Sequence, residues 1–182
     1  MAYSSIMQFV YDDGGRAAAG FSGKAGDCVT RAIAIIAELP YQDVYEALSA
    51  GSRSQRVTKH AKQKSSARDG VSTTRKWFRD YMTELGFTWT ATMGIGTGCQ
   101  VHLLAEELPA GRLIVSVSKH YTAVIDGVIH DTHNPQREVH SLTPYRGQEL
   151  KPGETLIENG GHPQVTSIQR RCVYGYWSRQ TV

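Results

Sequence analysis

The sequence predicts a single α+β domain over residues 1–182, and three features support this prediction. Apolar residues recur at helical spacing in the first half of the chain, up to Gly86. Beyond Gly86, short segments alternate apolar and polar residues, as strands do. The composition, 40% hydrophobic over 182 residues, is sufficient for one buried core. This order predicts N-terminal helices, one of them central and buried, packed on a C-terminal antiparallel β-sheet.

The first helix is predicted to begin at Cys28 and to end before Pro40. An opening strand at "SIMQFVY" and a loop rich in glycine and alanine precede it. Asp27 has a residue type that commonly caps a helix N-terminus. One stripe of the helix contains Cys28, Ala32, Ile35, Ile36 and Leu39. A helix this apolar is normally buried, so we expect it at the centre of the fold.

Two more helices are predicted before the strands. The second covers residues 41–50, with Gly51 as its expected end. The third begins at the cap residue Ser72 and ends at Gly86. Both carry large apolar side chains at helical spacing: Tyr41, Val44, Tyr45 and Leu48 in the second, and Trp77, Phe78, Tyr81 and Leu85 in the third. We expect these side chains to pack in the core.

Residues 51–70, between these two helices, form a basic segment. Its only acidic residue is Asp69, and its basic residues are Arg53, Arg56, Lys59, Lys62, Lys64 and Arg68. The segment has almost no apolar residue that could anchor it, which favours a flexible insertion exposed to water. Its charge also makes it a candidate contact surface for an acidic partner. Because it contains no aromatic side chain to stack on bases, a nucleic acid is not the expected partner.

The segments after Gly86 predict a sheet that contains one well-defined hairpin. The expected strands are "FTWTAT", "RLIVSVS", "YTAVID", "VIHDT" and "RCVYGYW", with a short helix at "HLLAEEL". Asp126-Gly127 is a strong signal for a two-residue turn, which pairs Ile125 with Val128. In that register one face of the hairpin carries His120, Thr122, Asp131 and His133, and the other face carries His130. His120 and Asp131 are then diagonal neighbours within side-chain reach.

Cys28, His120 and Asp131 are the expected catalytic residues. A thiol at a helix N-terminus is favoured as the thiolate by the N–H groups there. A histidine oriented by a carboxylate can take the proton from such a thiol. Asp27 opposes thiolate formation by its charge, unless its carboxylate turns into the helix cap. His133 is a rival for the role of the base, since it lies on the same predicted face.

The cysteine usage and the apolar pattern predict a compartment. Cys28, Cys99 and Cys172 are odd in number, far apart and outside any Cys-x-x-Cys pair. We therefore expect reduced thiols, with neither a disulfide framework nor a zinc ribbon. No apolar run approaches the roughly 18 residues of a membrane span, and the N-terminus does not resemble a signal peptide. These features predict a soluble cytoplasmic protein without a membrane partner.

The order of the candidate residues resembles the papain-like cysteine peptidase superfamily. There a cysteine opens a buried helix after a glycine-containing turn, a histidine begins a later strand, and an Asp or Asn lies on the next strand. "GDCVTRAIA" looks like the signature of OTU-type deubiquitinases, and "HYTAVIDGVIHDTHNP" is similar to the His-to-Asp-Pro segment of bacteriocin-processing peptidases. The pattern also resembles small papain-like proteins encoded by tailed phages, which would imply the host cytoplasm as its location.

This resemblance implies a cysteine-dependent hydrolase that cleaves a polypeptide or an isopeptide-linked protein through a thioester. It implies no metal and no organic cofactor. Papain-like enzymes usually place a Gln before the cysteine to complete the oxyanion hole, and this chain has Ser22 there. Ser22 and Lys24 are the candidate donors beside the Cys28 N–H. Asn134, before Pro135, is the alternative third residue.

The departure at Ser22 also leaves a second function open. The chain could keep the papain-like fold and lack the chemistry. It would then be a catalytically inactive binding module or a phage-type inhibitor of a host protein, with the basic segment as a contact surface.

Overall fold

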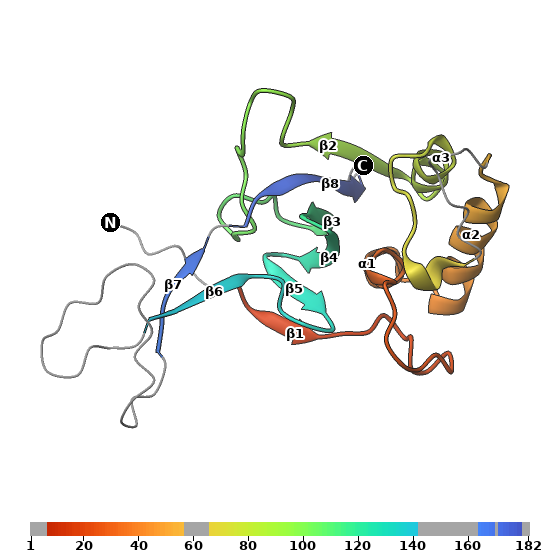
Figure 1. Cartoon of the computed structure of the whole chain (residues 1–182), viewed down its shortest axis with the longest axis horizontal. Helices are drawn as coiled ribbons and strands as arrows, with labels where there is room; N and C mark the ends of the chain where they lie inside the picture. Colours follow the sequence, from red (N-terminus) through yellow and green to blue (C-terminus); the bar gives the residue numbers. More distant parts are fainter. Residues whose placement is uncertain (1–6, 57–65, 142–163, 170, 180–182) are drawn as a thin grey trace, which may run out of the picture.

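The computed structural model describes residues 7–56, 66–141, 164–169 and 171–179. In this part of the chain, helices α1 (Cys28–Ala37), α2 (Tyr41–Ser54) and α3 (Lys76–Glu84) lie together on one side of a sheet (Figure 1). The sheet has the strand order β1-β5-β4-β3-β8-β2. These strands are β1 (Phe9–Tyr11), β2 (Phe87–Ala91), β3 (Arg112–Val117), β4 (His120–Ile125), β5 (Val128–Asp131) and β8 (Val173–Arg179). The α+β class is confirmed.

The sheet is mixed, whereas the sequence predicted an antiparallel one. β1 runs parallel to β5, with Phe9 beside Ile129 and Tyr11 beside Asp131. The other neighbours in this sheet are antiparallel. Hairpin turns fix the direction of strands that are close in sequence, but no turn joins β1 to β5, so the sequence did not reveal their relative direction.

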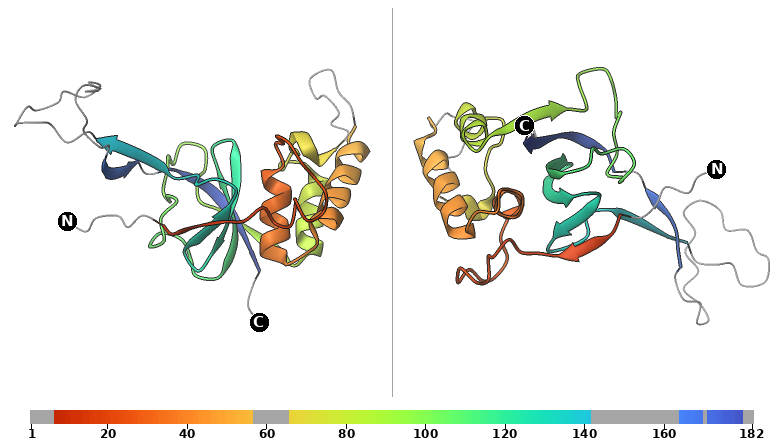
Figure 2. Two further views of the ribbon diagram at one scale, coloured as in Figure 1. Left: turned by 90° about the horizontal axis from the view of Figure 1, so that it is seen from below. Right: turned by 180° about the vertical axis from the view of Figure 1, so that it is seen from behind.

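A second, two-stranded sheet was not predicted. It consists of β6 (Arg137–Ser141) and β7 (Gln164–Gln169), which pair antiparallel. Figures 1 and 2 show it on the side of the larger sheet away from the helices. It therefore takes no part in the interface between helices and sheet.

The core lies on both faces of the larger sheet, and α1 is at its centre. Every residue of α1 after Cys28 is buried, as the apolar pattern predicted. The cluster between helices and sheet includes Ile33, Ile36, Val44, Leu48, Phe78, Met82, Ile114, Ala123 and Trp177. A second cluster includes Met7, Leu103, Leu113, Val115, Val124, Ile129 and Val173. Among the described residues, no helix has the length and apolar content needed to cross a bilayer.

Gly51 does not end α2, and the prediction that it would was wrong. The helix continues through Gly51 to Ser54. A Cβ at Gly51 would lie 2.2 Å from Cε3 of Trp77. The glycine is there because the indole of α3 packs directly on the backbone of α2, a contact that the local sequence does not disclose.

The basic segment is anchored at both of its described ends; residues 57–65 lie outside the described residues. Ser52, in α2, is fully buried. Ala67 begins the short 3-10 helix η1 (Ala67–Asp69), is also fully buried, and donates its N–H to Oγ of Ser49 at 2.9 Å. The carbonyl of Arg68 accepts the N–H of Gly26 at 2.7 Å. The expectation that nothing anchors residues 51–70 is therefore wrong at these two ends.

Two other predictions about helices were wrong. α3 begins at Lys76 and not at Ser72. Residues 102–108 form turns and not a helix. There, the side chain of Glu107 accepts the N–H of His102 at 2.6 Å and contacts its ring Nδ1 at 2.9 Å. These contacts close a compact loop, in which Leu103 and Leu108 pack in the second cluster.

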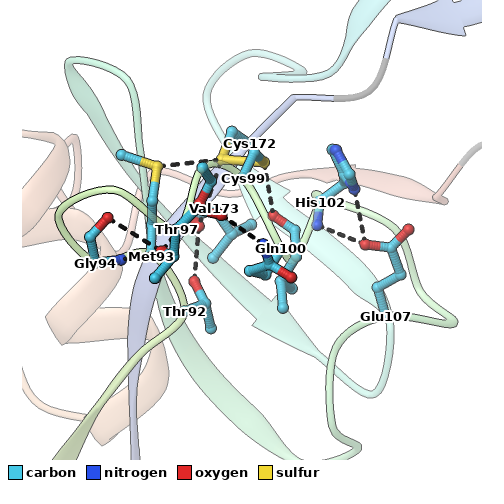
Figure 3. Close-up of a disulfide and its surroundings, with 12 residues drawn as sticks. Thr92, Met93, Gly94, Thr97, Cys99, Gln100, His102, Glu107, Cys172 and Val173 are labelled. Atoms are coloured by element: carbon cyan, nitrogen blue, oxygen red, sulfur yellow. Dashed lines mark hydrogen bonds and ion pairs between the residues drawn. A yellow bond between two sulfur atoms is a disulfide. The ribbon is translucent and has the colours of Figure 1, made fainter.

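Cys99 and Cys172 form a disulfide, so the expectation of reduced thiols was wrong for this pair (Figure 3). An isolated β-bridge between His102 and Cys172 brings the two distant segments side by side. Spacing along the chain could not show this, because the two cysteines are 73 positions apart. Cys28 is the free cysteine of the described residues.

Candidate active site

Cys28 is the first residue of α1 and lines a cavity of about 580 Å³. Burial raises the pKa of its thiol. The hydrogen bond with the His120 side chain, the charge of His120 and the backbone of Tyr121 lower it, and the net pKa lies below the ordinary value. The charge of Arg31 acts in the same direction. The surroundings of Cys28 therefore favour the thiolate.

The hairpin that carries His120 and Asp131 has the register predicted from its turn. Ile125 pairs with Val128, and the next pairs follow without a shift. Asp126 and Gly127 have φ values of 48° and 78°, so both turn residues adopt the left-handed backbone that this type of turn requires. Because the register holds, the start of β4 and the end of β5 lie side by side.

His120 and Asp131 are directly hydrogen-bonded, with Nε2 of His120 2.6 Å from Oδ2 of Asp131. Burial lowers the pKa of His120, but the bonds to Asp131 and Cys28 raise it to about 9. Burial raises the pKa of Asp131, and the hydrogen bond and charge of His120 lower it to a net value below the ordinary one. These shifts favour an imidazolium held between the sulfur of Cys28 and the carboxylate of Asp131.

Asp27 occupies the predicted N-cap position of α1, but its side chain does not cap the helix. Its side chain makes no cap hydrogen bond and is buried. The carboxylate accepts hydrogen bonds from Nε of Arg16 at 2.8 Å and from the hydroxyl of Tyr41 at 2.5 Å, and it forms an ion pair with Arg31. Two guanidinium groups thus compensate its charge, which removes the expected repulsion of a Cys28 thiolate.

Arg31 connects the thiol-bearing helix to the strand of Asp131. Its guanidinium pairs with Asp27 through Nη1, and its Nη2 lies 3.6 Å from Oδ1 of Asp131. The side chain is almost fully buried. The sequence analysis did not single out Arg31, although the four-residue spacing from Asp27 was a signal for an ion pair along the helix.

His133 lies against His120 but does not take the place of the base. Their ring centroids are 4.8 Å apart, and His133 is exposed. Asn134, the alternative third residue, accepts the N–H of Gln136 with its side chain at 3.0 Å. The structure thus brings Asp131, and not Asn134, into contact with His120.

Three of these side chains have the donor atoms that a metal ion prefers. Those of His120, Asp131 and His133 lie within 4.8 Å of one another, which makes them the metal-ligand candidates among the described residues. Asp131 is already bonded to His120 and paired with Arg31. The nearby positive charge of Arg31 opposes binding of a cation, so this set fits a proton better than a metal.

Ser22 and Lys24, the candidate oxyanion donors, are exposed and do not line the cavity. Their carbonyl oxygens accept hydrogen bonds from Arg16 at 3.1 Å and from Arg68 at 3.3 Å. The first turn of α1 offers another source. The N–H groups of Cys28 and Val29 have no acceptor within the helix, and both residues line the cavity.

One wall of the cavity was missed by the sequence analysis. It contains Asp69, Gly70, Val71, Thr73 and Thr74, part of which had been assigned to a flexible insertion. The sheet contributes Trp89, Ser116, Val117, His120, Tyr121 and Tyr174. Gly26 lies beside this wall, but a Cβ there would make only ordinary van der Waals contacts with Arg68 and Asp69, at 3.5 to 3.6 Å, so the sequence offered no clear signal for it.

No family model, no curated protein and no solved structure matches this chain. The site itself therefore carries the functional argument.

Proposed function

We propose that this chain is a cysteine-dependent hydrolase of papain-like architecture that cleaves an amide bond of a peptide or isopeptide. The observation that supports this most is the hydrogen-bonded series of Cys28, His120 and Asp131 at the mouth of a cavity. The lowered pKa of Cys28 and the raised pKa of His120 suit a nucleophile and its proton acceptor. The cysteine, the histidine and the aspartate also follow one another along the chain in the order typical of papain-like peptidases.

Acylation begins from the ion pair. Because Asp131 occupies Nε2 of His120, Nδ1 is the ring nitrogen left for the thiol. The Cys28 thiolate attacks the substrate carbonyl carbon, a C–S bond forms, and the carbonyl oxygen becomes an oxyanion. The N–H groups at the start of α1 can stabilise this oxyanion. The C–N bond then breaks, and the leaving amine takes the proton from His120, which leaves a thioester and a neutral imidazole.

In deacylation, a water molecule takes the place of the leaving amine, and His120 acts as a base. The neutral His120 takes a proton from a water molecule, whose oxygen attacks the thioester carbonyl. The C–S bond breaks, the carboxylic acid leaves, and the thiolate and imidazolium are restored. Asp131 keeps the imidazole in one orientation through both steps.

Alkylation and turnover together test this function. At pH 6 an ordinary thiol is almost fully protonated, so rapid labelling of Cys28 by iodoacetamide requires the ion pair. We expect His120→Ala to slow this labelling strongly. We also expect Cys28→Ala to abolish peptide hydrolysis, by on the order of 10⁴-fold or more, and to keep the fold. Slow labelling of Cys28 in the unmodified protein, at the rate of a free thiol, would contradict the proposal.

An inactive binding module is the second candidate, and one observation favours it. No side chain at Ser22 or Lys24 reaches the cavity to complete an oxyanion hole. In that case Cys28 would be labelled slowly and no peptide would be cleaved. The basic segment would then be tested for salt-dependent binding of an acidic partner.

A further inference from the structure

The cavity beside Cys28 continues into a second one. A neighbouring cavity of about 370 Å³ is lined by Thr73, Thr74, Arg79, Trp89, Tyr121 and Trp177. Thr73, Thr74, Trp89 and Tyr121 line both cavities. We call these six residues the side groove. A substrate chain bound at Cys28 can therefore extend into the side groove without leaving the surface of the protein.

The walls of the side groove are fixed by contacts within the fold. The ring of Trp89 lies on Gly175, where a Cβ would come within 2.3 Å of Cζ2, and its centroid is 5.2 Å from that of Trp177. The hydroxyl of Tyr121 donates to Oγ1 of Thr73 at 3.1 Å. The aromatic rings of Trp89 and Trp177 can pack against the methylene groups of a substrate side chain.

Arg79 supplies the only charge among the six residues of the side groove. Its guanidinium donates to the carbonyl of Thr74 at 3.2 Å, and this bond keeps the guanidinium beside another residue of the side groove. The ion pairs of the described residues do not include Arg79, although Lys76 and Asp80 on the same helix pair with each other. The side groove therefore combines the aromatic rings of Trp89 and Trp177 with a guanidinium that has no carboxylate partner within the described part of the chain.

We propose that the side groove selects polypeptide substrates that carry an acidic side chain, glutamate above all, near the bond cleaved at Cys28. This inference rests on the proposed hydrolase function. The methylene groups of the glutamate pack on Trp89, and its carboxylate binds the guanidinium of Arg79. Because Arg79 is exposed and its charge is screened, the expected preference for Glu over Gln is roughly three- to tenfold in kcat/KM.

The experiment uses the full chain and a peptide library in which every position is randomised with Glu and Gln in equal amounts. Mass spectrometry of the products gives the residues on both sides of the cleaved bond. Matched peptides with Glu or Gln at the selected position then give the ratio of kcat/KM. The proteins compared are the unmodified chain, Arg79→Gln, Arg79→Glu and the control Arg75→Gln, which removes an exposed charge next to α3 but outside both cavities.

We expect one position to prefer Glu in the unmodified chain and in Arg75→Gln. Arg79→Gln should lose this preference, and Arg79→Glu should disfavour Glu. All variants should keep the iodoacetamide reactivity of Cys28, which shows that the catalytic residues are intact. Cleavage without a Glu preference, or a preference that persists in Arg79→Gln, would overturn the inference and leave the hydrolase function standing.

Two further outcomes are equally decisive. A reactive Cys28 with no cleavage of any linear peptide would overturn the inference, since the substrate would then be of another kind. A Cys28 that is labelled as slowly as a free thiol would instead remove the proposed function on which the inference rests.

Discussion

The guanidinium of Arg31 lies 3.6 Å from a carboxylate oxygen of Asp131 and also forms an ion pair with Asp27. One buried side chain thereby connects α1, which carries Cys28, to β5, which carries Asp131. The positive charges of Arg16, Arg31 and a protonated His120 balance those of Asp27, Asp131 and a Cys28 thiolate. Such a set is stable only while each member has its partner.

Replacing Arg31 should alter both stability and thiol reactivity. We expect Arg31→Gln to lower the free energy of unfolding by about 3–5 kcal/mol, because it leaves two buried carboxylates with less compensation. The apparent pKa of Cys28 should rise, since Arg31 now lowers it. Arg31→Lys keeps the charge but cannot reach both carboxylates, so it should be intermediate. Denaturant titration and the pH dependence of alkylation measure the two effects.

The matched control for Arg31 is Ile36→Val, a core change on the same helix. It should cost about 0.5–1.5 kcal/mol and leave the pH profile of Cys28 where it is. If Arg31→Gln also left that profile unchanged, Arg31 would be a structural residue with no influence on the thiol.

Asp131 should be the third catalytic residue. Asp131→Asn keeps a hydrogen-bond acceptor but loses the charge, so the pKa of His120 should fall from about 9 and activity should drop without vanishing. Asp131→Ala should be worse. Asn134→Ala should lose only the local bond to Gln136 and remain active. The rates of peptide hydrolysis decide, and a damaging Asn134→Ala beside a silent Asp131→Ala would transfer the role to Asn134.

The stability of the Cys28→Ala variant should depend on pH more than that of the unmodified protein. The pKa of His120 is raised from 6.5 to about 9 on folding, and that of Cys28 is lowered from 9.0. As the pH rises, the folded histidine keeps a proton that the unfolded one loses, and the folded cysteine loses a proton that the unfolded one keeps. The two contributions to the pH dependence of stability therefore oppose each other.

In Cys28→Ala only the histidine remains. The bond to Asp131 still raises its folded pKa, so its contribution is complete below about 6.5 and is lost as the pH rises through the folded pKa. The free energy of unfolding between pH 6 and 9 should therefore decline more steeply in the variant than in the parent. Equal slopes would mean that no ion pair forms.

The disulfide should stabilise the fold and leave the chemistry alone. The double change Cys99→Ser with Cys172→Ser should lower stability by about 2–5 kcal/mol, because the bond closes a long loop. Neither cysteine lines the cavity of Cys28, so labelling at pH 6 should be unchanged. Thermal unfolding with and without reductant provides the same comparison, and a loss of Cys28 reactivity on reduction would show that the two regions are coupled.

The hairpin and the contact between His120 and Asp131 could be predicted because the residues that determine them are close in sequence. Asp126 and Gly127 fix the register of β4 and β5, and alternation along the strands then brings His120 to Asp131. The apolar pattern of α1 predicted its burial for a similar reason.

The features that were missed depend on partners far away in the sequence. Asp27 has a residue type typical of caps, but Arg16 and Tyr41 take its carboxylate. Gly51 is a residue type typical of helix ends, but here it allows the ring of Trp77 to pack on the backbone of α2. The disulfide and the direction of β1 likewise follow from tertiary contacts, which no local pattern encodes.

The pairing of β1 with β5 joins the first part of the chain to be made to a strand that is made much later. Tyr11 is made early, but it lies beside Asp131, and the N–H of Asp12 donates to the Asp131 carbonyl at 2.9 Å. A nascent chain that has not yet released β5 from the ribosome contains the Cys28 thiol without its base and orienting carboxylate. Ribosome-bound chains arrested before His120 should thus label at the rate of a free thiol, and released chains far faster. The proposed hydrolase would thus gain its activity only after most of its translation is complete.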